Sequence, residues 1–208
     1  MKKKHLLIIS AFILFLSCKK KNADFTIKGL ATDTTFSKPL SNATVKLYQV
    51  PVGSSDEFLI TTLKTDAQGN YTLSFPREKI EKYHLVINKS NYFAIDETIY
   101  FSELSLESDY IKNVSTTAMS WAKLTFHNLN PQVGDHLQYI KQNGKDGCLE
   151  CCPISYQDYY GSIDTSIYCI NDGNTDYSYL YWVLGASDQG NRTVLTTAFD
   201  TSEVILNY

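Results

Sequence analysis

The sequence has 208 residues, of which 43% are hydrophobic, 20% charged and 13% aromatic, with 10 Gly and 5 Pro. This composition excludes a disordered chain, a collagen-like repeat and a protein with many membrane-spanning helices. The net charge of −3 is unfavourable for neutralising phosphates, so we expect no nucleic-acid partner. Val, Ile, Thr and Tyr occur throughout the chain, and these residues favour strands over helices.

Residues 1–17 have the features of a secretory signal. Three lysines at positions 2–4 precede an apolar run, residues 6–16, which is too short to cross a bilayer as a helix. The segment from Leu14 to Cys18 resembles the lipobox of bacterial lipoproteins. The resemblance implies that Cys18 becomes the mature N-terminus and carries two or more acyl chains such as palmitate, enough for stable membrane anchoring. An ordinary signal peptide followed by a chance Cys is the alternative.

Residues 18–24 are then a lipidated tether. Removing residues 1–17 takes away three Lys and no acid, so the net charge changes from −3 to −6. The lysines at positions 19–21 lie next to the lipid, where they can meet anionic headgroups. Lys19 is not the Asp that marks inner-membrane retention in Gram-negative lipoproteins, and the tether lacks the acidic residues of some surface-export signals. We therefore expect the periplasmic face of the outer membrane, rather than the cell surface.

The first half of the mature chain alternates apolar and polar residues, as half-buried strands do. Residues 43–47 alternate in this way, and residues 58–65 and 71–75 flank the turn from Asp66 to Asn70. In this turn, Gly69 is expected to adopt a positive φ.

Segments 25–29, 39–45 and 65–73 together resemble the carboxypeptidase regulatory-like domain. The resemblance implies a transthyretin-like β-sandwich over residues 25–117. It implies no peptidase centre, because this family is an accessory domain.

The second half, residues 118–208, continues the period-two pattern without resembling a known family. Strands are expected near residues 122–126, 136–142, 166–170, 177–184, 192–198 and 202–207, with a hairpin turn at 187–191. The predicted fold class is therefore all-β, with two consecutive β-sandwich domains of which the first is transthyretin-like. One larger sandwich is the alternative.

Four cysteines remain after Cys18, and their even number in an exported chain favours disulfides: Cys148, Cys151, Cys152 and Cys169. A bond between the adjacent Cys151 and Cys152 is disfavoured by geometry, so Cys169 is expected to pair with one of them and close a loop over residues 153–168. A zinc site of four thiolates and a calcium loop at residues 172–176 are weaker alternatives. We expect no metal and no cofactor.

No catalytic motif is evident in the sequence. The mature histidines, His84, His127 and His136, do not form a short zinc motif, and no Gly-x-Ser-x-Gly elbow occurs. We therefore expect that the protein is not an enzyme.

Tyrosines are dense in one stretch of the second half and form the candidate ligand surface: Tyr156, Tyr159, Tyr160, Tyr177, Tyr179 and Tyr181. In a strand, residues 177, 179 and 181 share one face, while Leu180, Trp182 and Leu184 share the other. One bulky face covers the core. The other meets either the first domain or a partner, for which a flat aromatic platform would suit a glycan or an envelope protein.

These features predict a lipid-anchored binding or adaptor protein of the bacterial envelope without catalytic activity. Its expected partners are the membrane, through the lipid anchor, and a glycan or an envelope protein. The alternatives are a carbohydrate-binding accessory of a glycan-uptake system, and an envelope enzyme with a Cys/His metal site.

Overall fold

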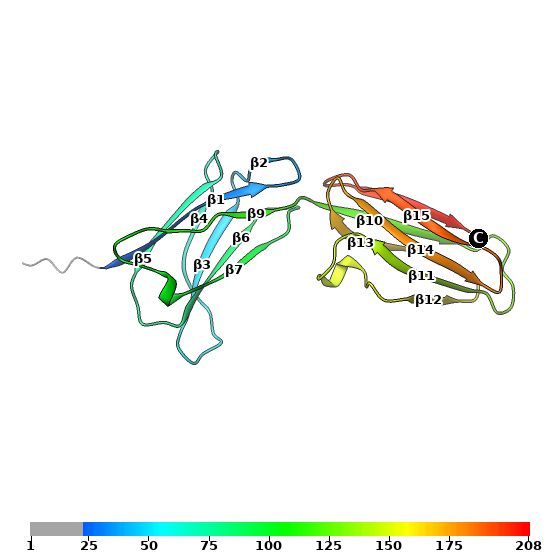
Figure 1. Ribbon diagram of the computed structural model, residues 1–208, viewed down its shortest axis with the longest axis horizontal. Helices are drawn as coiled ribbons and strands as arrows, with labels where there is room; N and C mark the ends of the chain where they lie inside the picture. Colours follow the sequence, from blue (N-terminus) through cyan, green and yellow to red (C-terminus); the bar gives the residue numbers. More distant parts are fainter. Residues whose placement is uncertain (1–22) are drawn as a thin grey trace, which may run out of the picture.

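The computed structural model describes residues 23–208, whose regular secondary structure is almost entirely β-strand (Figure 1). The strands form two consecutive β-sandwiches, as the sequence predicts. The signal segment, Cys18 and the lysines at positions 19–21 lie outside the described residues. Within residues 23–208, no helix has the length and apolar character needed to span a membrane.

The first sandwich consists of two facing sheets. One contains five strands, with β1 pairing to all the others: β1 (Asp24–Asp33), β2 (Lys38–Pro39), β5 (Asn70–Pro76), β8 (Tyr110–Ile111) and β9 (Val114–Thr116). The other has the order β4 (Phe58–Lys64), β3 (Thr44–Val50), β6 (Lys82–Asn88) and β7 (Ile95–Tyr100), after which the short helix η1 (Phe101–Glu103) follows. The alternating apolar side chains of β5 and β6 point into the layer between the sheets.

The predicted hairpin turn precedes β5. The Asp66 carboxylate accepts hydrogen bonds from the backbone N–H groups of Gln68 and Asn70, at 2.9 and 2.8 Å. Gly69 has a φ of 79°, which confirms the expected positive value. A Cβ atom at this position would lie 2.5 Å from the carbonyl oxygen of Ala31, so the turn requires glycine for both conformation and space.

The second sandwich also has two sheets. The three-stranded sheet has the order β13 (Asp164–Asp172), β10 (Met119–His127) and β16 (Thr201–Asn207). The four-stranded sheet has the order β12 (Gln157–Tyr160), β11 (His136–Asn143), β14 (Asp176–Leu184) and β15 (Gln189–Leu195). The short helix η2 (Leu149–Cys151) lies in the connection between β11 and β12.

Each sandwich has its own hydrophobic core, one built from residues between positions 25 and 118 and the other from residues between 122 and 206. Only two residues separate β9 from β10. The Phe199 ring packs between Phe36 and Tyr92 of the first sandwich, with ring centroids 5.7 and 5.4 Å away. The Lys145 ammonium lies 4.0 Å from the centre of the Phe93 ring. These contacts hold the two sandwiches end to end, with β1 beginning at the end away from the second sandwich (Figure 1).

The segment 153–168 departs from the prediction of a loop, because it contains β12 and the start of β13. Strand β12 pairs with β11 from Tyr139 opposite Gln157 to His136 opposite Tyr160. One ring of β12, that of Tyr159, turns into the core and contacts Phe126 and Tyr139, with centroids 5.9 and 6.1 Å away. Strand pairing and the packing of the half-buried Tyr159, Ile163 and Ile167 against the core order this segment.

Candidate functional site

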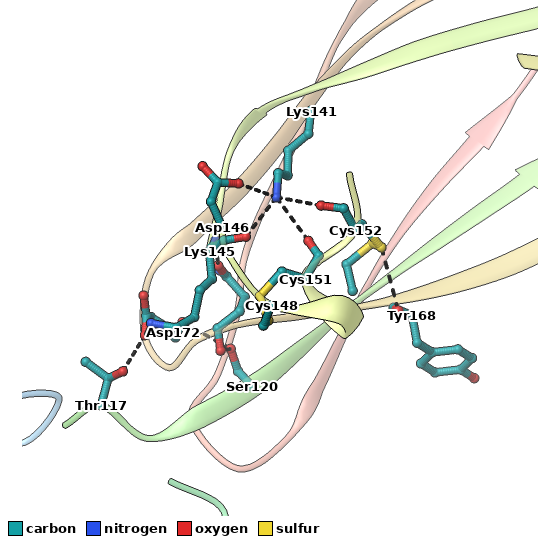
Figure 2. The surroundings of a disulfide bond; sticks show 12 residues. Thr117, Ser120, Lys141, Lys145, Asp146, Cys148, Cys151, Cys152, Tyr168 and Asp172 are labelled. Atoms are coloured by element: carbon teal, nitrogen blue, oxygen red, sulfur yellow. Dashed lines mark hydrogen bonds and ion pairs between the residues drawn. A yellow bond between two sulfur atoms is a disulfide. The ribbon is translucent and has the colours of Figure 1, made fainter. Parts of the chain in front are cut away.

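Two disulfides lie beside the four-stranded sheet of the second sandwich (Figure 2). Cys148 pairs with Cys151, and Cys152 pairs with Cys169, which confirms the predicted disulfides and selects one of the two partners considered for Cys169. Cys169 is fully buried on β13. The second bond therefore fastens the connection between β11 and β12 to the opposite sheet. We call residues 145–155 of this connection the stapled loop.

A buried lysine on β11 binds the backbone of the stapled loop. Lys141 ends the regular pairing of β11 before a bulge, and its side chain is only 2% exposed. Its ammonium group donates hydrogen bonds to the carbonyl oxygens of Lys145, Cys151 and Cys152 at 2.7, 3.0 and 2.8 Å. It also lies 2.5 Å from a carboxylate oxygen of Asp146 (Figure 2). A charged group surrounded by acceptors from one loop has a structural role, because its hydrogen-bonding capacity is used up.

Three of the predicted ligand tyrosines are in the wrong place for a ligand. Tyr177, Tyr179 and Tyr181 point into the second core and are at most 3% exposed. Burial raises the pKa of all three phenols. The three-stranded sheet on the other side of this core contributes the small residues Ala122 and Cys169. Large tyrosine rings are therefore needed to fill the space between the two sheets.

Tyr159 also belongs to the core rather than to a ligand surface, because its ring packs against the hydrophobic core of the second sandwich. Its pKa is raised by burial. Of the six predicted tyrosines, only Tyr156 and Tyr160 are well exposed, at 56% and 71%. They lie on the same side of the sheet as Trp182, the side opposite the buried tyrosines.

The exposed side of the sheet β12-β11-β14-β15 is the candidate site, and we call it the outer face. The register of β12, β11 and β14 brings together His136, Gln138, Asp158, Tyr160 and Trp182 at its centre, and Tyr156, just before β12, joins them through its contact with Trp182. The Tyr160 ring stacks on His136 with centroids 4.1 Å apart and planes at 21°. The Tyr156 ring lies 6.0 Å from Trp182. Two aromatic pairs therefore flank the middle of the outer face.

A carboxylate occupies the middle of the outer face. One oxygen of Asp158 accepts hydrogen bonds from His136 Nε2 at 2.7 Å and from Gln138 Nε2 at 3.0 Å. These hydrogen bonds lower the pKa of Asp158, with that from His136 contributing most. The carboxylate is thus ionised at neutral pH and held in a fixed orientation by its neighbours on β11.

The other histidines contact carboxylates of their own surroundings. His84 lies between Glu57 and Asp96, and His127 contacts Asp164. Across residues 23–208, no group of three or more His, Cys, Asp or Glu side chains is arranged to hold a metal ion. The segment considered for calcium is a tight connection from β13 to β14, in which Asp172 binds the Lys145 ammonium at 2.9 Å.

Sequence reasoning missed most of the polar residues of the outer face. It identified the strand face that carries Trp182, but it assigned the ligand role to the opposite, tyrosine-bearing face of that strand. His136 and Gln138 alternate with the apolar Leu137 and Tyr139, which is the signal that places them outside. Their contact with Asp158 depends on the pairing of β12, a strand that was not predicted.

Comparisons with known proteins do not assign the chain to a family. No protein-family model matches it, and no curated protein matches it. Among solved structures, the shaft pilin SpaA of Lactobacillus rhamnosus GG has a TM-score of 0.35 and 11% identity, with 88% of this chain and 96% of that chain covered. The Bacillus anthracis TIE protein has a TM-score of 0.38 and 12% identity, covering 88% and 34%. The minor pilin GBS52 of Streptococcus agalactiae has a TM-score of 0.33 and 13% identity, covering 88% and 94%. At such low TM-scores, neither a fold nor a role is transferred to this chain.

Proposed function

We propose that this protein is a lipid-anchored, non-catalytic binding protein of the bacterial cell envelope. In this proposal the first sandwich is a spacer, and the outer face of the second sandwich binds the partner. The observation that carries it is the two aromatic pairs, each with one exposed tyrosine, around the fixed Asp158 carboxylate. Such rigid aromatic side chains lose little conformational entropy on binding.

The end-to-end arrangement supports the spacer role. Cys18 precedes β1 by a tether of a few residues, and β1 begins at the end of the first sandwich away from the second. An acyl anchor on Cys18 therefore leaves the outer face on the part of the molecule farther from the membrane. Two disulfides agree with an oxidising compartment such as the periplasm. We further propose the periplasmic face of the outer membrane as its location.

We also propose that residues 25–117 are a carboxypeptidase regulatory-like domain. Support comes from the hairpin that carried the resemblance, in which Asp66 caps the turn and Gly69 has the positive φ that the motif requires. A β-sandwich over these residues agrees with the transthyretin-like fold of that family.

The anchoring part is tested by Cys18→Ala. We expect wild-type protein in the membrane fraction with acyl chains on an N-terminal Cys18 in mass spectrometry, and Cys18→Ala either soluble or retained as precursor. Wild-type protein recovered in the soluble periplasm would contradict the anchor.

The binding part is tested by photo-cross-linking in intact cells. A photoreactive residue at position 160 is expected to capture an envelope component, whereas the same residue at position 168 is not. Tyr168 is a matched control, because it is 57% exposed but lies on β13 of the opposite sheet. Equal capture from both positions, or capture from neither, would reject the outer face as the binding site.

A further inference from the structure

We infer that the outer face binds an uncharged oligosaccharide, with sugar rings stacked on its two aromatic pairs and hydroxyl groups on the Asp158 carboxylate. This inference rests on the proposed function and names the chemical class of the ligand.

The spacing of side chains along β12 and the residue before it is the first reason. Asp158 and Tyr160 lie on β12, and Tyr156 directly precedes this strand. The three side chains alternate onto one side of the chain, so a carboxylate lies between two rings. The two tyrosines are four residues apart, which corresponds to about 13 Å along an extended strand. Each tyrosine ring lies against a second ring: that of Tyr160 stacks on His136 of β11, and that of Tyr156 lies tilted by 52° against Trp182 of β14. The site therefore offers two separate stacking platforms, which suits a ligand of several linked rings better than a single ring.

The hydrogen-bonding capacity of the centre is the second reason. An ionised carboxylate can only accept hydrogen bonds. One oxygen of Asp158 already accepts from His136 and Gln138, and its other oxygen has no partner within residues 23–208. A ligand must therefore bring O–H or N–H donors to the middle and present apolar faces on both sides. Sugar rings have this combination, with C–H groups on their faces and hydroxyl groups around their rims.

The charge of the centre distinguishes this ligand from two others. The cores of protein–protein interfaces are depleted in Asp, so a fixed carboxylate between the rings is unfavourable for a protein partner. The hydrogen bonds from His136 and Gln138 lower the pKa of Asp158, so it stays negative at neutral pH. An acidic glycan would place its own carboxylates or sulfates against this charge. Of these three classes, an uncharged glycan fits the arrangement of rings and charge.

The inference is tested by affinity electrophoresis of the mature full-length protein in detergent. Gels contain a panel of neutral polysaccharides (β-glucans, α-glucans, xylan, galactomannan) or acidic ones (polygalacturonate, hyaluronan). We expect retardation by at least one neutral polysaccharide and by neither acidic one. Oligosaccharides of the retarding polymer should compete, whereas its monosaccharide should not.

Three variants locate the effect. Tyr160→Ala and Asp158→Asn are each expected to weaken the retardation at least tenfold, whereas Tyr168→Ala retains it. Asp158→Asn keeps the shape of the side chain, and both positions are on the surface, so an unchanged melting temperature verifies that the variants fold. Retardation by no neutral polysaccharide, or retardation that survives both outer-face variants, would overturn the inference.

The cross-linking experiment separates this inference from the proposed function. Capture of an envelope protein from position 160 but not 168, without glycan binding, would leave the proposed function standing and reject the sugar ligand. Absence of both would reject the two together.

Discussion

Replacing the buried Lys141 by Met tests how the stapled loop is held. Met keeps most of the apolar stem but removes the ammonium, which donates to three carbonyl groups of the loop. A buried acceptor that loses its charged donor costs about 1.5–3 kcal/mol. Only the Cys151 carbonyl belongs to a fully buried contact, and the other two are part-buried. One full and two partial losses lower the free energy of unfolding by about 3 kcal/mol in total.

The assay is differential scanning calorimetry of the oxidised protein. For a domain of this size, about 3 kcal/mol corresponds to a fall in Tm of at least about 12 °C. Lys123→Met is the matched control in the same sandwich, because the Lys123 ammonium contacts Glu203 at 2.8 Å on the surface. Loss of such a surface pair costs less than about 1 kcal/mol. Equal Tm values for the two Lys variants would refute the reasoning, and so would increased hydrogen exchange confined to regions outside residues 145–155.

Four further predictions concern single interactions. Replacing Cys152 and Cys169 by Ser removes the disulfide that links positions 17 residues apart, and this should lower the free energy of unfolding by about 3 kcal/mol. An unchanged urea midpoint would contradict this. Tyr179→Ala should cost about 3–5 kcal/mol, whereas Tyr179→Phe should be neutral or stabilising by about 1 kcal/mol, because the buried hydroxyl has no partner among the described residues. A clear loss of stability in Tyr179→Phe would show that this hydroxyl is used. Gly69→Val should destabilise the first sandwich by about 1–2 kcal/mol or more in thermal unfolding. An unchanged Tm would contradict the positive φ of residue 69 in this turn. Burial lowers the pKa of His84, but hydrogen bonds from its ring to Glu57 and Asp96 raise it, with a net rise above the ordinary 6.5. Its contribution to stability is therefore complete below pH 6.5 and is lost as the pH rises through the folded pKa. An NMR titration of the His84 ring should give a midpoint above 6.5, and a lower midpoint would refute its contacts with Glu57 and Asp96.

The elements that sequence alone predicted are those with a strong local signal. The hairpin from Asp66 to Asn70 carries its own turn residues, and β10, β11 and β14 carry long period-two patterns. In contrast, β8 and β9 have two and three residues and pair in parallel with β1, about 83 positions away in the chain. Such short strands form because a distant partner is present, so no local pattern reveals them.

The candidate site was harder to predict because both sides of β14 carry large side chains. Periodicity separates Tyr179 from Trp182, but it does not say which side meets the opposite sheet. The small residues that make room for the tyrosines, Ala122 and Cys169, lie on other strands. Lys141 has the same difficulty: its position on the inner side of β11 follows from the pattern, but the carbonyl groups that bind it come from a folded loop.

Hydroxyl-radical footprinting in native envelopes tests the proposed binding role of the outer face most directly. Oxidation rates of tyrosine are compared between the protein in isolated envelopes and the purified protein in detergent. We predict that Tyr156 and Tyr160 become several-fold less reactive in envelopes, whereas Tyr100 and Tyr168, which are also exposed but lie on other sheets, do not change. Unchanged reactivity at Tyr156 and Tyr160, or protection centred on Tyr100 or Tyr168, would contradict a binding site on the outer face.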